Sequence, residues 1–438
     1  MKYIVLLLAI SLLIIVISTQ PMWASIFSSY QLTSNRFTIN NICQPTDTNY
    51  FSCYGGLDSS SVINVNGSEF SKLQSQIPIT VELLGFTNIN GDISFTLNKK
   101  NSLIIGSSDL DYEFTYIKGN NSSIDGVATL KFNPWASASL DNFNFYNLQE
   151  IIINNYGYAN QLINLTFNNN NNLKVNVIDS VVAFNNVTFN MLDNSELSLN
   201  FIAKKEGVLE VMGNTTTITG SNSAKAKVNI SGNGNNEIIL QGINSDLATI
   251  INISSISLKA LGEINLKHKN SELLVNKGSV TGNFNFLNSN NNINLINSSL
   301  EGNINFYQYH NTVKLNNFHS RGKINFYKGS NDINISSYFS GEITLLDSNN
   351  SIKLQGTVLE NSIVNTNSTL ELQAYNSYIN NSNSFIFTGS GSNALTFSST
   401  NISANLVFNN KGYTNIIFED NGKPSYFGSH LNIKDQSE

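Results

Sequence analysis

Between residues 262 and 345, apolar and polar residues alternate within five-residue words that recur about every 20 residues. The words open on Gly262, Gly282, Gly302, Gly322 and, one position short of the same spacing, Gly341, and Gly242 precedes this series by 20 residues. The third position of the word is apolar in Ile264, Phe284, Ile304, Ile324 and Ile343. The fifth is apolar in Leu266, Phe286, Phe306, Phe326 and Leu345. A period of two predicts a β-strand with one buried face.

A second alternating segment follows within each period, as in Ile293/Leu295, Val313/Leu315, Ile333/Ile335 and Ile352/Leu354. Two short strands within such a period form one coil of a solenoid, whose equivalent residues stack about 4.8 Å apart. The alternation continues upstream and downstream with a looser period. We therefore expect an all-β protein, a right-handed parallel β-helix (β-solenoid) with coils of about 20 residues. The right hand follows the precedent of parallel crossovers.

The residues between the strands fit tight corners. Glycine permits a sharp turn that a Cβ would hinder. Asparagine recurs before the second strand, where it tolerates left-handed backbone and can stack its amide on the next coil; these residues are Asn291, Asn311, Asn331 and Asn350. Opposite charges one period apart predict two surface ion pairs, Glu301 with Arg321 and Lys323 with Glu342.

Proline and hydropathy divide the chain into four parts. No proline occurs between Trp135 and Lys423, as continuous sheet requires. We assign residues 150–420 to the repeat array, 25–149 to an N-terminal β-rich cap with the first irregular coils, and 421–438 to a polar tail. Residues 1–24 combine a positive start with an apolar run too short to span a bilayer, which predicts a secretory signal peptide. An uncleaved anchor is the alternative.

Composition narrows the function. Only 12% of the residues are charged, the net charge is −6 and the only arginines are Arg36 and Arg321, which argues against a nucleic-acid partner. The 40% of hydrophobic residues suffice for a core, while 75 asparagines supply polar positions. Export makes a disulfide between the two cysteines, Cys43 and Cys53, plausible. Two free thiols are the alternative.

Catalytic signatures are sparse. Parallel β-helices include pectin-degrading enzymes, whose sites need clustered carboxylates, but adjacent acidic residues occur only at Glu419–Asp420. Four scattered histidines and two cysteines suggest no metal site, and no motif indicates a cofactor. The densest polar cluster is His310, His319 and Arg321 within one period, which could hold a sugar or an anion or form an ordinary polar surface. Exposed aromatic residues that could bind a ligand, or simply shield coil edges, are Tyr307, Tyr309, Tyr327 and Tyr338.

Two segments, 131–155 and 165–190, resemble the passengers of the vacuolating-cytotoxin-like autotransporters of Helicobacter. The likeness rests on a "PW" word, an "NLKV" word and an "FNN" word, with the matching residues Pro134, Trp135, Leu173, Lys174, Val175, Phe184, Asn185 and Asn186. It implies a right-handed β-helix displayed on, or shed from, an outer membrane after passage through a translocation unit. It also implies contact with host cells. This chain differs in its polar ending and in the polar stretch after the signal, which speaks against pore formation.

These observations favour a secreted or surface-displayed, non-enzymatic β-helix that acts as an adhesin or toxin-like passenger on host cells or glycans. Two alternatives remain. One is a structural extracellular spacer, and the other is a pectin-lyase-like carbohydrate-active enzyme or its remnant.

Overall fold

The structure is a computed structural model and is nearly all β, with 70% strand and 2% helix. The predicted signal peptide, Pro134, Trp135 and the end of the tail lie outside the residues that it describes. The described residues are 42–57, 59–73, 75–106, 114–133, 137–154, 159–204, 208–232, 236–360, 363–380, 384–419, 422–428 and 431–433.

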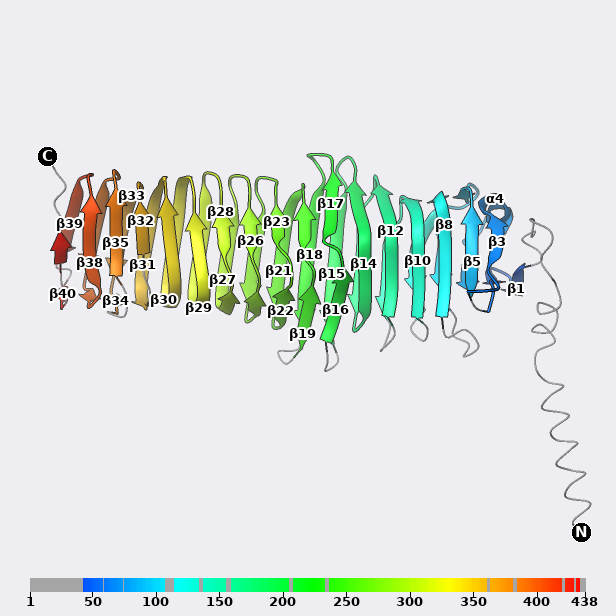
Figure 1. Ribbon diagram of the computed structural model, residues 1–438, viewed down its shortest axis with the longest axis horizontal. Coiled ribbons are helices and arrows are strands. Elements are labelled where there is room, and N and C mark those ends of the chain that lie inside the picture. The colour runs from blue at the N-terminus through cyan, green and yellow to red at the C-terminus, as the bar shows by residue number, and fades with distance from the viewer. Residues whose placement is uncertain are drawn as a thin grey trace, which may run out of the picture.

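The chain forms a parallel β-solenoid of about 15 turns with coils of about 22 residues, which confirms the predicted fold class. Figure 1 shows the coils stacked into a straight rod, with the strands roughly perpendicular to its long axis. Equivalent residues are 20 apart in the most regular part, as in Asn305 and Asn325. They are 29 apart between Asn200 and Asn229. Longer connections in the upstream coils therefore raise the mean coil length above the predicted period.

Each coil contributes to three walls, because strand pairing follows three separate series along the rod. The first wall contains β1 (Cys43–Asp47), β2 (Tyr50–Tyr54), β4 (Thr80–Leu84), β7 (Asn101–Ile105), β9 (Val127–Phe132), β11 (Glu150–Asn154), β13 (Leu173–Ile178), β15 (Glu196–Ala203), β18 (Lys225–Gly232), β21 (Ala248–Ser254), β24 (Glu272–Asn276), β33 (Thr369–Tyr375), β36 (Asn393–Ser398) and β39 (Thr414–Glu419).

The second wall contains β3 (Ile63–Asn66), β5 (Phe86–Asn90), β16 (Val208–Gly213), β19 (Glu237–Leu240), β22 (Ser257–Ala260), β25 (Ser279–Thr281), β34 (Tyr378–Ile379), β37 (Asn401–Ile402) and β40 (Tyr426–Phe427). The third wall contains β6 (Ile93–Ser94), β17 (Thr216–Gly220), β20 (Ile243–Ser245), β23 (Ile264–Leu266), β26 (Phe284–Phe286), β28 (Ile304–Phe306), β32 (Ile363–Thr366), β35 (Ser384–Gly389), β38 (Asn405–Asn410) and β41 (Leu431–Ile433).

Eight long strands bend around a corner and belong to more than one wall. Those shared by the second and third walls are β8 (Phe114–Asp125), β10 (Ser137–Tyr146), β12 (Ala159–Asn169) and β14 (Val181–Met191). The first and second walls share β27 (Asn292–Glu301) and β31 (Ser348–Leu359). All three walls include parts of β29 (Asn311–Phe326) and β30 (Gly329–Leu346).

The core is a set of stacked columns of identical or similar side chains. Phe286, Phe306 and Phe326 stack in register on the third wall, with ring centroids 5.1 and 4.7 Å apart. Phe145, Phe167 and Phe189 form an equivalent column upstream, with both centroid distances at 5.2 Å. All six rings are fully buried. Burial of such rings stabilises the fold, because each removes a large apolar area from water.

Asparagine shapes the corners through its backbone as well as its amide. The corner between the second and third walls carries a left-handed residue in four consecutive coils: Asn121, Asn142, Asn164 and Asn186. The prediction for Asn291 and Asn311 needs a correction. The left-handed residue is the one before each of them, Asn290 or His310, while Asn291 itself is buried and donates to the amide oxygen of Asn311 at 2.9 Å.

The glycine column marks the corner that leads into the third wall. A Cβ on Gly302 would overlap the carbonyl oxygen of Gly282, and one on Gly322 would overlap that of Gly302. Gly302 also has φ +130°. Glycine is therefore required here by the close approach of consecutive coils as well as by the turn.

The N-terminal end differs from the rest of the rod. β1 pairs antiparallel with β2, and a disulfide joins Cys43 to Cys53 across that pair. A short helix, α4 (Gly67–Phe70), and the 3-10 turn η1 (Ser71–Leu73) follow β3, and Phe70 enters the core. Parallel pairing begins with β2 and β4 and continues through residue 150 without a break. Parallel pairing between successive coils is therefore already present in the segment 25–149, with register shifts between β7 and β9 and between β8 and β10.

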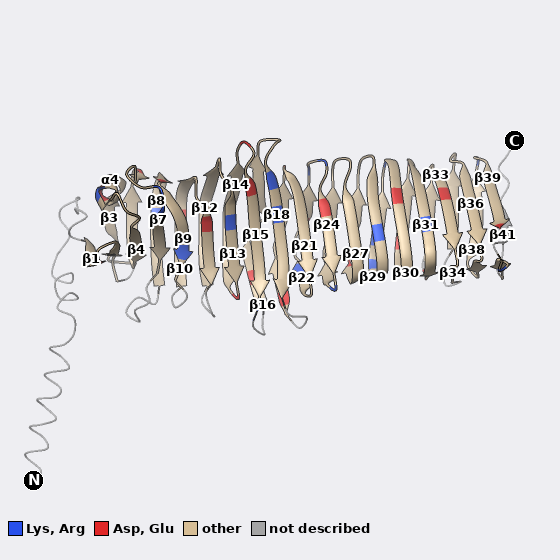
Figure 2. Ribbon diagram, turned by 180° about the vertical axis from the view of Figure 1, so that it is seen from behind, with Lys and Arg blue, Asp and Glu red and all other residues tan. Residues whose placement is uncertain are grey.

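One of the two predicted ion pairs forms. Lys323 Nζ lies 2.8 Å from a carboxylate oxygen of Glu342, in the adjacent coil. The prediction for Glu301 and Arg321 is wrong, because these two described residues form no ion pair. Both are exposed, and little free energy is gained by holding two long side chains together in water. Figure 2 shows the charged residues scattered along the rod.

Candidate functional site

The structure separates the residues that the sequence grouped as a possible binding surface. Tyr307, Tyr309, His310 and Tyr327 lie at the corner between the third and first walls, shortly after the end of β28 or β29. Tyr307 and Tyr327 stack there, with centroids 4.9 Å apart and planes 12° apart. Burial raises the pKa of Tyr307. Tyr307 and Tyr327 therefore pack against each other across adjacent coils, whereas Tyr309 is half exposed.

His319 and Tyr338 lie on the second wall, and the structure does bring these two together. Their ring centroids are 4.5 Å apart. The Tyr338 hydroxyl donates to the carboxylate of Glu360, and this hydrogen bond, followed by burial, raises the pKa of Tyr338. The Ser340 hydroxyl lies 3.5 Å from His319 Nδ1. Tyr338 is therefore held in a fixed orientation by groups from the coils on both sides.

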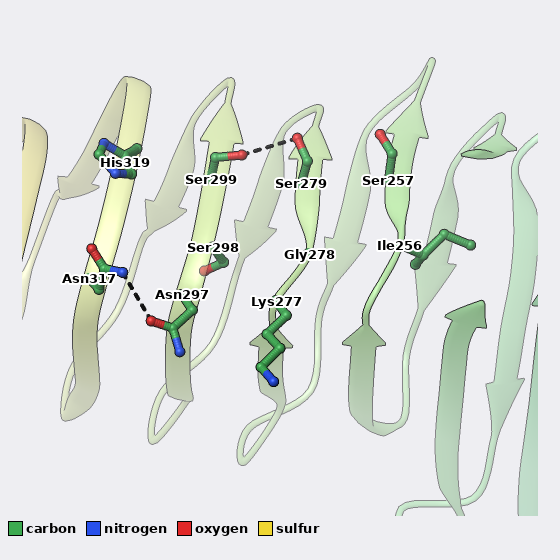
Figure 3. A pocket seen from close by; sticks show the side chains of 10 residues that line it. All are labelled: Ile256, Ser257, Lys277, Gly278, Ser279, Asn297, Ser298, Ser299, Asn317 and His319. Carbon is green, nitrogen blue, oxygen red and sulfur yellow. Dashed lines mark hydrogen bonds between the residues drawn. The ribbon is translucent and has the colours of Figure 1, made fainter. Parts of the chain in front are cut away.

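A groove of about 370 Å³ begins at His319 and crosses four coils of the second wall. We call it the serine groove (Figure 3), and its lining residues are Ile256, Ser257, Lys277, Gly278, Ser279, Asn297, Ser298, Ser299, Asn317 and His319. One row along it consists of Ser257, Ser279, Ser299 and His319, which are in register. The other row consists of Lys277, Asn297 and Asn317, which all have left-handed backbone.

Hydrogen bonds run along both rows of the serine groove. Ser299 donates to the hydroxyl of Ser279 at 3.0 Å, and the Asn317 amide donates to Asn297 Oδ1 at 3.0 Å. Figure 3 shows the two rows facing outward on either side of Gly278. The rows present hydroxyl, amide and ammonium groups at a repeat of one coil, about 4.8 Å. This arrangement suits a ligand that offers hydroxyl groups at regular intervals.

The groove forms where the inward side chains become small. Along the second wall, the buried column passes from Ile256 through Gly278 and Ser298 to Phe318. Glycine and serine fill less of the core than isoleucine or phenylalanine, so the wall can lie closer to the axis at these two coils. The Ser298 hydroxyl is buried and has no hydrogen-bond partner among the described residues.

Sequence reasoning found His319 but missed the other members of the serine groove. The signal was present, because Ser257, Ser279, Ser299 and His319 follow one another at nearly constant intervals of one coil. Serine is common throughout the chain, so its recurrence was not informative without the strand register. Arg321 lies beyond the groove, near the next corner of the coil.

Two carboxylates in the N-terminal half of the rod, those of Glu82 and Asp141, are buried and hydrogen-bonded. Glu82 accepts from the Ser52 hydroxyl at 2.9 Å, and burial, together with the charge of Glu82, raises the pKa of Tyr50 to about 12. Asp141 accepts from Tyr116 at 3.0 Å and from Asn164 at 3.2 Å. Burial, followed by the hydrogen bond to Asp141, raises the pKa of Tyr116 to about 12. These groups connect adjacent coils of the walls.

Among the described residues, no cluster of three His, Cys, Asp or Glu side chains could hold a metal ion. The described helices are all too short or too polar to cross a membrane. Comparison of the chain with protein-family models, with curated proteins and with solved structures finds no match in any of the three.

Proposed function

We propose that this chain is a secreted or surface-displayed, non-enzymatic β-helix that binds glycans of host cells, as an adhesin or a toxin-like passenger. The serine groove is the observation that carries this proposal. Its rows of hydroxyl and amide groups repeat along the rod, so a ligand with repeating hydroxyl groups can form the same hydrogen bonds in successive coils. Such binding depends on many modest contacts rather than on a single strong one.

Export and the family resemblance support the same proposal. The apolar N-terminal run predicts secretion, and the words around Leu173 and Phe184 resemble passengers of vacuolating-cytotoxin-like autotransporters. Such a passenger would reach the cell surface through an outer-membrane translocation unit. The rigid, hydrogen-bonded walls would keep the groove accessible without rearrangement, which lowers the entropic cost of binding.

The proposal is tested by binding of the labelled chain to epithelial cells. We expect saturable binding that is lost when a double variant, Ser299→Asp and Asn317→Asp, places carboxylates in both rows of the groove. Asn334→Asp on the first wall is the matched control, because Asn334 is exposed and equally polar. Binding that glycosidase treatment of the cells abolishes would identify the receptor as a glycan. An absence of saturable binding would favour the spacer interpretation, and equal binding of the groove variant would show that the serine groove does not carry the binding.

A further inference from the structure

A row of outward residues that carries a tyrosine in every second coil continues the second wall beyond the serine groove. Strand register aligns Tyr338, Val358, Tyr378, Asn401 and Tyr426 in five successive coils. Tyr378 is 39% exposed and Tyr426 is 67% exposed, although both are large and partly apolar. We call Tyr338, Tyr378 and Tyr426 the tyrosine column.

The three tyrosines occupy every second coil. Neighbouring strands lie about 4.8 Å apart, so successive rings of the tyrosine column are separated by about 10 Å along the rod. Two sugar rings of an extended β-1,4-linked glycan span the same length. In such a glycan alternate sugars present the same face, so each tyrosine meets an equivalent apolar sugar face.

Polar residues occupy the next outward position in the first four of these five coils. They are Ser340, Glu360, Asn380 and Ser403, which alternate along the strands with inward residues. Hydroxyl, carboxylate and amide groups beside an aromatic ring are the combination that an amphipathic ligand needs, with one apolar face and a polar rim. The His319–Tyr338 contact joins the column to the serine groove, so both lie along one continuous track.

We propose that the tyrosine column binds an extended β-1,4-linked polysaccharide whose chain runs parallel to the rod axis. This inference rests on the proposed function, because it names the class of glycan and the direction in which it lies. Each ring packs against the apolar face of every second sugar, and the polar column binds the sugar hydroxyls. The three rings span four coil spacings, or about 20 Å, which corresponds to about five sugars.

Soluble oligosaccharides test the inference by calorimetry on the full chain. The probes are cellohexaose and chitohexaose, with maltohexaose as the α-linked control and cellobiose as the short control. We expect at least one β-linked hexasaccharide to bind, the α-linked one not to bind, and the disaccharide to bind at least about tenfold more weakly, because it reaches one ring only.

Two variants locate the binding site. Tyr378→Ala together with Tyr426→Ala should weaken hexasaccharide binding by about tenfold or more. Tyr413→Ala removes a more exposed tyrosine outside the column and should change nothing. Both targets are partly exposed, and an unchanged thermal unfolding midpoint would verify the fold. Tyr378→Trp should retain binding, since it preserves a flat ring.

The outcomes separate this inference from the proposed function. Binding to cells without binding to either β-linked hexasaccharide would overturn the inference and leave the proposed function standing. Equal affinity for maltohexaose, or no loss in the double variant, would also overturn it. Failure to bind both cells and all oligosaccharides would overturn both proposals.

Discussion

The side-chain amide of Asn325 donates to the amide oxygen of Asn305, one coil away, at 2.8 Å. Asn305 in turn donates to Asn285, and Asn285 to Asn265, each at 2.8 Å. This column lies on the outside of the third wall, between the inward isoleucine and phenylalanine columns. Asparagine therefore links successive coils where a charged residue would repel its own copies.

Replacing Asn305 should weaken this link from both sides. In Asn305→Ala the amide of Asn325, only 9% exposed, loses its acceptor, and Asn285 loses its donor. We expect a loss of about 1–3 kcal/mol in the free energy of unfolding. Urea unfolding measures it. Asn334→Ala, at an exposed position of the first wall, should cost less than about 0.5 kcal/mol, and equal costs at the two sites would refute the explanation.

Two glycine substitutions separate close packing from backbone strain. Gly302→Ala brings a Cβ into overlap with a carbonyl oxygen and requires an alanine at φ +130°. Gly356→Ala introduces backbone strain alone. An alanine there must adopt φ +57°, but no atom lies within 4 Å of its Cβ. We expect a cost of about 1 kcal/mol at Gly356 and a several-fold larger cost at Gly302. Thermal unfolding of the two purified variants gives the comparison.

The phenylalanine column makes a prediction about the core. Phe306 is fully buried between Phe286 and Phe326. Phe306→Ala should cost about 3–5 kcal/mol, because the stacked neighbours cannot close the cavity. Phe306→Leu should recover more than half of that loss by filling the space. Chemical unfolding of both variants would test this, and a loss below about 1 kcal/mol for the alanine variant would indicate that the coils can collapse into the gap.

The raised pKa of Tyr116 predicts a loss of stability at high pH. The ordinary pKa of tyrosine is about 10, and in the folded chain the pKa is about 12. The neutral hydroxyl therefore stabilises the fold fully below pH 10, and this contribution disappears as the pH rises towards 12. In Tyr116→Phe the fold should be less stable at pH 8, because Asp141 loses a donor. The difference from the parent chain should shrink between pH 10 and 12, as unfolding midpoints at each pH would reveal.

The sequence predicted the strands whose apolar and polar residues alternate at a regular period. Ile304 and Phe306 alternate with Asn305, and the same alternation recurs in the adjacent coils, so the inward and outward columns there followed from the sequence. The site was harder to predict because residues half a coil apart in sequence lie on different walls. His310 and His319 are separated by a whole strand of the first wall and a corner. Their closeness in sequence suggested a common site, but the corner between them places the two side chains on different faces of the rod.

The strand register supplied what the sequence lacked. Tyr378 lies two coils after Tyr338, and nothing local marks either residue as part of a column. The serine groove likewise depends on two small inward residues of the same wall, Gly278 and Ser298, which become equivalent only through the strand register. Such features arise from the side chains that differ between successive coils, which the repeated pattern alone does not reveal.

The glycine column also makes the length of the rod an adjustable quantity. Gly282 and Gly302 occupy equivalent corners, one coil apart. Removing the segment 282–301 would join two matching corners and shorten the rod by one strand spacing, about 4.8 Å. Removing half of that segment would bring a strand of one wall into another and turn core side chains outward. The length of the rod can thus change by duplication or loss of whole coils, while the remaining coils keep their inward and outward residues.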